Sequence, residues 1–332
     1  MAISQHLLQI LDRLADGRFH SGTELAESAA ISRSAVCKQL QNLDKLDLGY
    51  SAISGKGYKL NQPLQLLDEN TIRQALNENT RALLQRLEIH PCLASTNTYL
   101  QHAGSAHATA CFAEYQTAGR GRRGRQWVSP FGRNIYLSLR YHYQSGPAVI
   151  AGLSLAVGVA VIRALNSLNI NDAGLKWPND IYWQHKKLGG ILIEVGGEAE
   201  GPSHAVVGLG LNGFLPQHLS QTIDQPCTDL YSIVGDKAFT LRNRLAAALL
   251  NQLTPVLHDF DATALPSFIE EWRQYDCLYG KTVTLYQGKQ QHQGILDGID
   301  EHGQLLLCTA YGNRQTFASG EISFRPGHED SA

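Results

Sequence analysis

The pattern of apolar and polar positions is most regular in the first 62 residues, where three runs have helical spacing. Leu7, Leu8, Leu11 and Leu14 recur at the spacing of one helix face, and Gly17 follows where such a helix would end. Residues 21–24, with the sequence Ser-Gly-Thr-Glu, have the spacing of a capping box. They predict the start of a second short helix.

A third helix is predicted to begin after Ser32, a residue type that caps helix N-termini. Its apolar face holds Val36, Leu40, Leu43 and Leu46. Two short alternating segments follow at residues 50–53 and 58–60, and the Ser-Gly-Lys-Gly sequence between them predicts a β-hairpin. Three helices followed by a hairpin are the elements of a winged helix-turn-helix unit, so we expect residues 1–62 to form one.

The polar side of the third predicted helix suggests a function for this unit. Within the helix-turn-helix from Gly22 to Gln41, the residues opposite the apolar face are Ser32, Arg33, Ser34, Lys38 and Gln39. Side chains of these types contact phosphates and base edges in the major groove, and Lys56 and Lys59 lie where a wing would reach the DNA backbone. The alternative is a helical protein-interaction module, which the local balance of seven Lys and Arg against six Asp and Glu supports. The order of the elements favours DNA.

After Asn61-Gln62-Pro63, a natural linker, the pattern changes twice. Residues 67–275 alternate helical and strand patterns, with strands predicted at residues 110–113, 135–139, 191–195 and 205–209 and an apolar helix at residues 150–165. Residues 280–324 contain four short strand-like segments, at residues 283–286, 293–296, 305–308 and 315–317. They are separated by Gly, Asp and Asn turns and predict a small β-barrel. We therefore expect an α/β multidomain chain with domains at residues 1–62, 67–275 and 276–330, the central one α+β with a mixed sheet.

Composition narrows the function classes. With 43% hydrophobic and 17% charged residues among 332, the chain is expected to fold, and a net charge of −2 gives no overall attraction to nucleic acid or membrane. Six scattered cysteines without C-x-x-C spacing predict neither a zinc site nor a disulfide framework. The most apolar stretch, residues 148–162, is shorter than a membrane span, and the N-terminus lacks a signal-peptide pattern. A cytoplasmic protein without membrane contact is expected.

Residues 119–125, Gly-Arg-Gly-Arg-Arg-Gly-Arg, form what we call the arginine–glycine loop. Four arginines this close repel one another unless an anion lies among them, and glycines let backbone N–H groups approach that anion. The loop lacks the Walker pattern. An exposed RNA-binding or localisation tract would have the same composition. A strand-like segment before the loop, and Trp127 and Phe131 after it, indicate instead a loop held within a folded domain.

Three further segments carry candidate chemistry. Residues 176–180, Lys-Trp-Pro-Asn-Asp, precede the Lys187-Leu-Gly-Gly sequence. Lys176 could neutralise a phosphate during the ATP-dependent activation of a carboxylate. Asp180 could orient Lys176 or a metal ion. Residues 95–97, Ser-Thr-Asn, begin a predicted helix and suit a polar ligand such as a ureido ring. Residues 208–212, Gly-Leu-Gly-Leu-Asn, place glycines along a strand, where a ligand could approach closely.

Each of these segments also has a plain structural explanation: a surface turn, a helix N-cap and a β-bulge, respectively. No Ser/His/Asp order or cysteine nucleophile stands out, so we expect no covalent enzyme intermediate.

Together and in this order, the segments resemble the bifunctional biotin protein ligases that also act as biotin operon repressors. The resemblance covers essentially the whole chain, and the pairing of the arginine–glycine loop with Lys-Trp-Pro-Asn-Asp is highly specific. The matching segments are residues 20–22, 32–35, 55–58, 95–97, 114–116, 119–125, 176–180, 208–212 and 320–323. The resemblance also implies that the C-terminal β-barrel is SH3-like.

The resemblance implies a two-step reaction. Biotin and Mg-ATP would give biotinyl-5'-adenylate and pyrophosphate, and a lysine of the biotin carboxyl carrier protein of acetyl-CoA carboxylase would then attack the mixed anhydride. Biotin would contact Ser95, Thr96, Asn97, Gln116, Arg120, Gly121, Arg122, Lys176, Gly208 and Gly210. The adenylate would contact Arg120, Arg122, Trp127, Lys176, Asn179 and Asn212. Lys176 and Arg122 would be the catalytic residues, and no metal site built from protein ligands is expected.

The same resemblance implies regulation. The loaded protein would form a homodimer through its central domain, and the dimer would bind operator DNA. Residues 213–231 do not match the family's adenine-covering segment, so Phe214, Leu219 or Ile223 are candidates for that cover. Two other functions remain open from the sequence: a lipoate-ligase-like acyl transferase, and a non-enzymatic regulator gated by a ligand.

Overall fold

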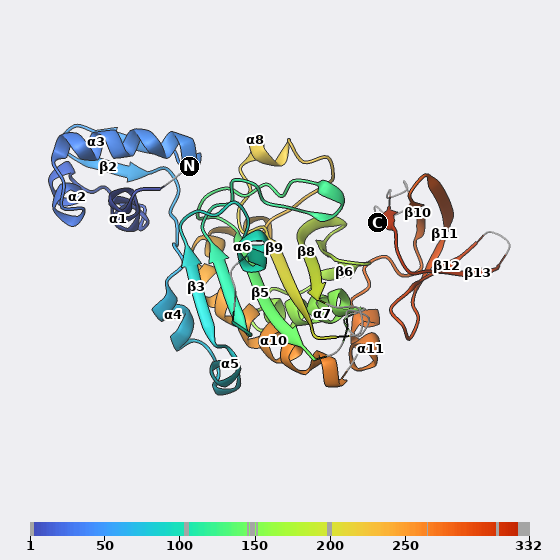
Figure 1. Cartoon of the computed structure of the whole chain (residues 1–332). Helices are drawn as coiled ribbons and strands as arrows, with labels where there is room; N and C mark the ends of the chain where they lie inside the picture. Colours follow the sequence, from blue (N-terminus) through green and yellow to red (C-terminus); the bar gives the residue numbers. More distant parts are fainter. Residues whose placement is uncertain are drawn as a thin grey trace.

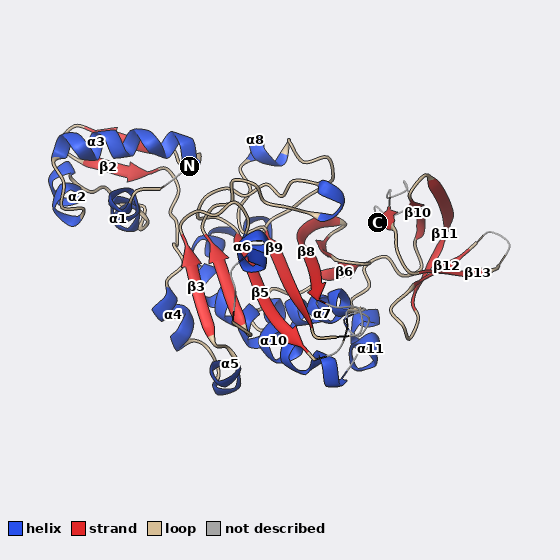
Figure 2. Cartoon of the chain, viewed as in Figure 1, coloured by secondary structure: helices blue, strands red, loops and turns tan. Residues whose placement is uncertain are grey.

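The computed structural model describes residues 3–102, 106–144, 146, 150, 152–197, 201–263, 265–309 and 312–324, and side chains in the last helical turn before residue 264 are not described. The chain forms three units in a row: N-terminal helices, a central sheet covered by helices, and a C-terminal sheet (Figure 1). Helices and strands are interleaved only in the central unit (Figure 2).

The N-terminal unit contains α1 (Gln5–Leu14), α2 (Gly22–Ser28), α3 (Arg33–Gln41), the 3-10 helix η1 (Asn42–Leu46), β1 (Tyr50–Ile53) and β2 (Gly57–Leu60). Each helix begins with a serine whose hydroxyl accepts a backbone N–H: Ser4 for α1, Ser21 for α2 and Ser32 for α3. The three predicted helices and the antiparallel hairpin are all present. Only the predicted length of the third helix was wrong, because Leu43 and Leu46 lie in η1, after α3 has ended.

A small core of its own holds this unit together. The inward faces of α1 and α3 bury leucines and Val36 almost completely, as their spacing predicted. Two residues from outside the unit join this core: Leu64 of the linker and Phe131 of the central unit. Arg133 adds polar contacts, since its guanidinium donates to the Asp47 carbonyl over 3.1 Å and to Gln62 over 3.2 Å. The segment after the arginine–glycine loop therefore reaches the N-terminal helices.

The central unit is built on a seven-stranded sheet in the order β3-β4-β5-β9-β8-β7-β6. Its strands are β3 (Arg86–His90), β4 (Thr109–Ala113), β5 (Ile135–Tyr143), β6 (Gly174–Lys176), β7 (Asp180–Trp183), β8 (Lys186–Gly197) and β9 (Ser203–Leu211). β3 and β4 are parallel and the other neighbours antiparallel, so the predicted mixed sheet is confirmed. The four predicted strands fall within β4, β5, β8 and β9. The sequence pattern had not indicated β3, β6 or β7.

Helices cover both faces of this sheet (Figure 1). One face carries α7 (Leu153–Asn166), α10 (Arg242–Thr263) and α11 (Pro266–Gln274), and the other carries α6 (Thr96–His102). α7 is buried along nearly its whole length, which explains its uniformly apolar sequence. Residues 148, 149 and 151 of the predicted apolar stretch lie outside the described residues. The remaining helices are α4 (Glu69–Gln74), α5 (Glu78–Leu83), α8 (Gln217–Ser220), α9 (Leu230–Val234) and the 3-10 helices η2 (Arg122–Gly124) and η4 (Gly235–Thr240).

The C-terminal unit is a five-stranded antiparallel sheet in the order β13-β12-β11-β10-β14. Its strands are β10 (Thr282–Gln287), β11 (Gln290–Ile299), β12 (Leu305–Cys308), β13 (Arg314–Phe317) and β14 (Glu321–Ser323). The four predicted strand segments lie within β10 to β13. Apolar side chains of this sheet and of the central unit form one continuous core, so the C-terminal sheet packs firmly on the central unit.

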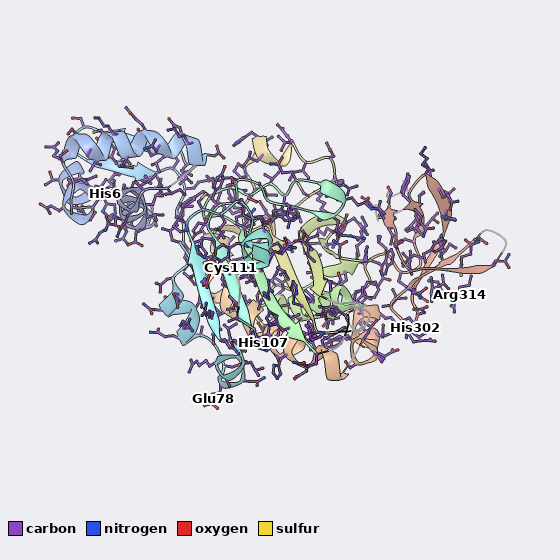
Figure 3. The ribbon with its side chains drawn as sticks, viewed as in Figure 1. His6, Glu78, His107, Cys111, His302 and Arg314 are labelled. Atoms are coloured by element: carbon purple, nitrogen blue, oxygen red, sulfur yellow. The ribbon has the colours of Figure 1, made fainter. Side chains whose placement is uncertain are left out.

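Two further observations concern the chain as a whole. All six cysteines are free, and Cys111 lies fully buried in the central sheet (Figure 3). Among the described residues, no helix combines the length and apolar character needed to cross a bilayer.

Candidate active site

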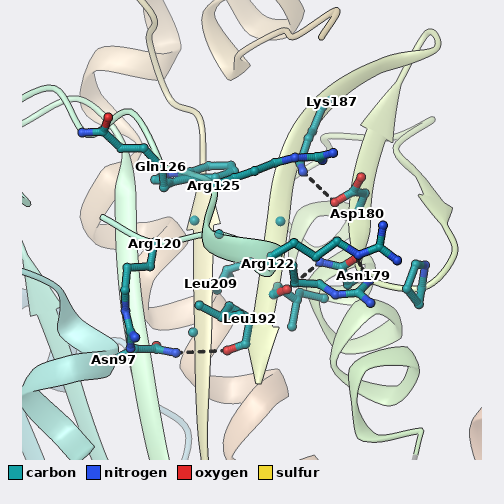
Figure 4. A pocket seen from close by; sticks show the side chains of 18 of the residues that line it. Asn97, Arg120, Arg122, Arg125, Gln126, Asn179, Asp180, Lys187, Leu192 and Leu209 are labelled. Carbon is teal, nitrogen blue, oxygen red and sulfur yellow. Dashed lines mark hydrogen bonds and ion pairs between the residues drawn. The ribbon is translucent and has the colours of Figure 1, made fainter. Parts of the chain in front are cut away.

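A cavity lies between the central sheet, the arginine–glycine loop and the first residue of β14 (Figure 4). Of the residues predicted to contact a small molecule, it is lined by Ser95, Thr96, Asn97, Gln116, Arg120, Gly121, Arg122, Trp127, Lys176, Asn179, Gly208 and Gly210. They come from segments more than a hundred positions apart, and folding brings them to one place. Asn212 is not part of the lining.

The arginine–glycine loop covers this cavity as a short hairpin. The Gly121 N–H donates to the Arg125 carbonyl over 2.7 Å, and the Trp127 N–H donates to the Gly119 carbonyl over 2.9 Å. The tip is the turn η2, where Arg123 and Gly124 have φ values of 56° and 75°. Glycine adopts that left-handed conformation without strain, which explains one of the three glycines.

Each arginine of the loop contacts a side chain outside the loop, and two of them share one carboxylate. Arg120 donates to Glu194 over 2.6 Å. Arg122 donates to the Asn179 side-chain oxygen over 2.8 Å, as Figure 4 shows. Arg123 and Arg125 both reach Glu321 of β14, over 3.4 and 2.7 Å. Carboxylates from two different sheets thus offset most of the repulsion within the loop.

The charge of Glu321 fits this arrangement. Burial alone would raise the pKa of Glu321, but hydrogen bonding to Arg125 and the charges of Arg125 and Arg123 outweigh it and leave the pKa below its usual range. The carboxylate is therefore ionised at neutral pH. β14 was not among the predicted strands, so the pairing of Glu321 with the loop could not be predicted from the sequence.

Two cations facing the cavity have no carboxylate partner among the described residues. Arg122 contacts only the Asn179 amide oxygen, and the Lys176 ammonium donates to the Tyr182 hydroxyl over 2.9 Å. Burial lowers the pKa of Lys176, which the charge of Asp180 only partly opposes. Burial also lowers the pKa of Arg122, and the neighbouring Arg123 adds to the effect. An anion in the cavity would stabilise the charged forms of both side chains, because it would supply the counter-charge that they lack.

A second lysine lies in the cavity and was not among the predicted site residues. The Lys187 ammonium is 2.7 Å from Asp180 and faces the ring of Trp127, 5.8 Å from its centre. Asp180 thus forms its ion pair with Lys187 and not with Lys176, for which the sequence had suggested it. The Lys187-Leu-Gly-Gly segment had been noted beside Lys176, but nothing in the pattern distinguished the two lysines. Only the fold shows that both enter the cavity.

The side of the cavity near α6 is lined by small polar groups. The Gln116 side-chain oxygen accepts the Thr96 N–H over 2.9 Å, and the Ser138 hydroxyl lies 2.7 Å from the Thr96 hydroxyl. Asn97 is fully engaged: its amide nitrogen donates to Leu192 and Glu194, and its oxygen accepts from Ser138 over 2.6 Å. Asn97 therefore supports its neighbours, whereas Thr96 and Gln116 retain hydrogen-bonding capacity for a ligand.

The two strand glycines lie under other side chains. A Cβ on Gly208 would lie 2.2 Å from the Asn97 side-chain oxygen, and a Cβ on Gly210 would lie 2.4 Å from the Trp127 ring. Glycine is thus needed at both positions so that Asn97 and Trp127 can approach the sheet. The sequence had attributed these glycines to contact with a ligand ring; the structure provides a reason that requires no ligand.

Trp127 lines the cavity above Gly210 of β9. Its indole nitrogen is buried against Gly210 without a hydrogen-bond partner among the described residues. Of residues 213–231, only Gln225 belongs to the lining. Phe214, one of the predicted adenine covers, packs instead against Tyr231 and Phe239 at ring separations of 5.3 Å. Asn212 is buried, and its amide donates to the Thr228 carbonyl over 3.0 Å.

The predicted nucleic-acid contacts lie far from this cavity, on the N-terminal unit. Ser32, Arg33, Ser34 and Lys38 are all exposed along one side of α3, and Lys56 is exposed in the turn between β1 and β2. The α3 residues are free to meet a partner, because the buried side of α3 faces α1 and α2.

Two family models match the chain. Residues 89–212 match the Biotin/lipoate A/B protein ligase family, and residues 279–325 match the Biotin protein ligase C terminal domain. These segments contain most of the cavity lining and Glu321.

Relatives extend the similarity to nearly the full length. The Bifunctional ligase/repressor BirA of Salmonella typhimurium is 38% identical over 96% of this chain and 97% of its own length. The protein of the same description from Escherichia coli is 37% identical over the same shares. Among solved structures, the biotin protein ligase from Aquifex aeolicus in complex with biotin and ATP aligns with a TM-score of 0.61 at 28% identity, over 74% of this chain and all of its own. The chain belongs to the family of bifunctional ligase/repressor BirA proteins.

Proposed function

We propose that this chain is a biotin protein ligase that activates biotin with ATP and transfers it to a carrier protein, and that it also represses transcription from a biotin operon. The observation that supports the activation step most directly is the pair of cations, Arg122 and Lys176, which face the cavity without a carboxylate partner among the described residues. Membership of the ligase/repressor family supports both activities.

In the first step, a carboxylate oxygen of biotin attacks the α-phosphorus of ATP, and pyrophosphate leaves. Negative charge on the phosphate oxygens is stabilised by Lys176 and Arg122, which are already desolvated and require little rearrangement. Lys187 and Asn179 line the same region and add donors. Mg²⁺ would be bound mainly by the nucleotide phosphates, because no group of three or more His, Cys, Asp or Glu side chains in the described part of the chain could hold it.

In the second step, the amine of a carrier-protein lysine attacks the carbonyl of the mixed anhydride. The new amide bond forms as the bond to AMP breaks. The arginine–glycine loop acts as a lid in both steps, since it covers the cavity and excludes the water that would hydrolyse the anhydride. Arg120, Gly121 and Arg122 then lie over the intermediate, and Trp127 covers its nucleotide side.

The biotin ring would lie on the α6 side of the cavity. Ser95, Thr96 and Gln116 offer the hydroxyl and amide groups that match a ureido ring, and Asn97 holds Thr96 and the strand in place through Ser138. Gly208 and Gly210 form the floor. Asn212, outside the lining, would reach the adenylate only if the segment after β9 moves on binding.

The proposed organisation follows the three units: a winged helix-turn-helix at residues 1–62, the ligase domain at 67–275 and an SH3-like barrel at 276–330. Support for the first comes from the order of helices and hairpin and from the exposed Arg33, Lys38 and Lys56. The loaded protein would act as a homodimer on operator DNA. Such a protein works in the cytoplasm, where its carrier protein and its operator are found.

The decisive experiment incubates the full chain with biotin, Mg-ATP and a biotin carboxyl carrier domain, and follows labelled biotin on the carrier. Parallel reactions replace biotin by lipoate or omit ATP. Transfer that requires both biotin and ATP is the expected result. A preference for lipoate, or no transfer at all, would refute the ligase proposal.

A gel shift tests repression separately. DNA from upstream of the organism's biotin synthesis genes is mixed with the protein, with and without biotin and ATP. A shift that strengthens when both are present is expected, whereas binding that is equal to that of random DNA would contradict the repressor role.

A further inference from the structure

We propose that Glu194 is a positioning residue that joins the arginine–glycine loop to the biotin side of the cavity. Its carboxylate would make closure of the loop and correct placement of the ring depend on one another. The inference rests on the proposed ligase function, but the contacts that carry it are all between residues of the chain itself.

One oxygen of Glu194 holds both sides together. Its Oε2 accepts the Arg120 guanidinium over 2.6 Å and the Asn97 amide over 2.9 Å. Arg120 belongs to the loop, whereas Asn97 belongs to α6 below it, and Figure 4 shows Arg120 extending from the loop toward Asn97. The Glu194 side chain is 23% exposed and the Arg120 side chain 41% exposed, so the ion pair lies at the rim of the cavity and is only partly shielded from water.

From Asn97 a chain of hydrogen bonds continues into the cavity. The Ser138 hydroxyl lies 2.6 Å from the Asn97 oxygen and 2.7 Å from the Thr96 hydroxyl, and Thr96 in turn contacts Gln116. A ring that hydrogen-bonds to Thr96 or Gln116 therefore acts on a network whose far end is Arg120. The Asn97 side chain already lies against the backbone of Gly208, so Asn97 cannot move closer to the sheet.

The other carboxylate on the loop does not have this property. Glu321 pairs with Arg123 and Arg125 near the tip and belongs to the C-terminal sheet. It can hold the loop down, but among the described residues it contacts neither Asn97 nor Thr96. Only Glu194, among the carboxylates that contact the loop in the described structure, also contacts the biotin side.

Glu194→Gln tests the idea with little change in shape. The amide can still accept a hydrogen bond from Asn97 but loses the charge that holds Arg120, so the closed loop becomes less favourable. In the ligand-free protein, hydrogen exchange at the Gly121 and Trp127 amides, which close the loop hairpin, should be about tenfold faster. Release of bound biotinyl-5'-adenylate should also be about tenfold faster, while the melting temperature stays unchanged.

A double-mutant cycle with Arg120→Gln separates positioning from a general effect on the fold. If Glu194 acts through Arg120, the double variant releases the adenylate no faster than either single variant. Multiplicative effects on release would overturn the proposal. Glu270→Gln, which removes an exposed carboxylate that pairs with Arg273 on α11, is the matched control and should change neither exchange nor release.

The exchange measurement also keeps this inference apart from the proposed function. A wild-type protein that forms no adenylate would refute the ligase proposal, yet exchange in the ligand-free loop would still decide whether Glu194 holds it. Unchanged exchange in Glu194→Gln would refute the positioning role, even in an active ligase.

Discussion

The N-terminal helices and the central cavity both present cations to a charged partner, but they assemble them differently. On α3 the polar residues are neighbours in sequence, and Arg33, Ser34 and Lys38 are exposed to solvent. In the cavity, Lys176 and Arg122 come from distant segments, and their positions depend on Tyr182 and Asn179. Single residues on α3 should therefore contribute separately, whereas residues of the cavity should act as a coupled set.

The difference arises from solvent. An exposed cation keeps most of its hydration and interacts with a partner through a high dielectric, so each contact is worth little. A buried cation has lost hydration, and its interaction with an anion is correspondingly stronger. Variants in the two regions should therefore differ in the size of their effects and in whether these combine additively.

The largest effect is expected from Lys176→Ala. Removing a desolvated cation next to the reacting phosphate should lower biotin-dependent pyrophosphate exchange by about 10²–10³-fold. Binding to DNA that is measured without biotin and ATP should be the same for this variant and for the wild type. Lys237→Ala, an exposed lysine of η4, is the control and should exchange normally. Undiminished exchange in Lys176→Ala would remove its proposed role.

Arg122→Gly should act mainly on retention of the intermediate. Without this side chain the loop loses its contact with Asn179 and the cavity loses a cation, so bound adenylate should escape and hydrolyse about 10²-fold faster. Trapping of radiolabelled adenylate on the protein measures this directly. If the variant retained adenylate as well as wild type does, the assignment of the loop as a lid would be wrong.

A smaller effect concerns stability and pH. Asp276 lies beside β6, with one carboxylate oxygen buried and unpartnered among the described residues, and burial raises its pKa to about 6. Because the pKa of Asp276 is higher in the folded than in the unfolded protein, the folded state favours the protonated carboxyl. The stability of the fold is therefore unreduced below about pH 4, where the carboxyl is protonated in both states, and it falls as the pH rises through about 6. Asp276→Asn should remove that loss and stabilise the protein by about 2 kcal/mol at pH 7.5 relative to wild type.

Urea unfolding at pH 4.5 and pH 7.5 measures this difference. The gain for Asp276→Asn should be much larger at the higher pH. An equal gain at both values would show that the carboxyl does not titrate in this range.

The smallest effects are expected on α3. Arg33→Ala and Lys38→Ala should each weaken binding to DNA a few-fold at moderate salt, and each should reduce the salt dependence by about one counterion. Because the two side chains are exposed and separate, their effects should add in the double variant. Strong coupling between them would contradict the contrast between the two regions.

The N-terminal unit could be predicted from the sequence more completely than the central unit and its cavity. The caps Ser21 and Ser32, the leucine spacing and the Gly-containing turn of the hairpin act over a few residues, so the three helices and the hairpin of the N-terminal unit could be predicted, though not the separate 3-10 helix η1. Strands β4, β5, β8 and β9 were found because buried strands have dense apolar runs. Strands β3, β6, β7 and β14 were missed, since each has only three to five residues, too few for a clear apolar pattern.

For the candidate site, the sequence alone singled out the arginine–glycine loop, Lys176 and the Ser-Thr-Asn segment, and the structure places all three at one cavity. Only the tertiary structure decided how they work. It assigned Asp180 to Lys187, brought Glu194 and Glu321 to the loop, and placed Asn97 and Trp127 over the strand glycines. The reason is physical: charge and backbone preference are properties of a residue and its near neighbours, whereas desolvation and ion pairing depend on which distant segments the fold brings into contact.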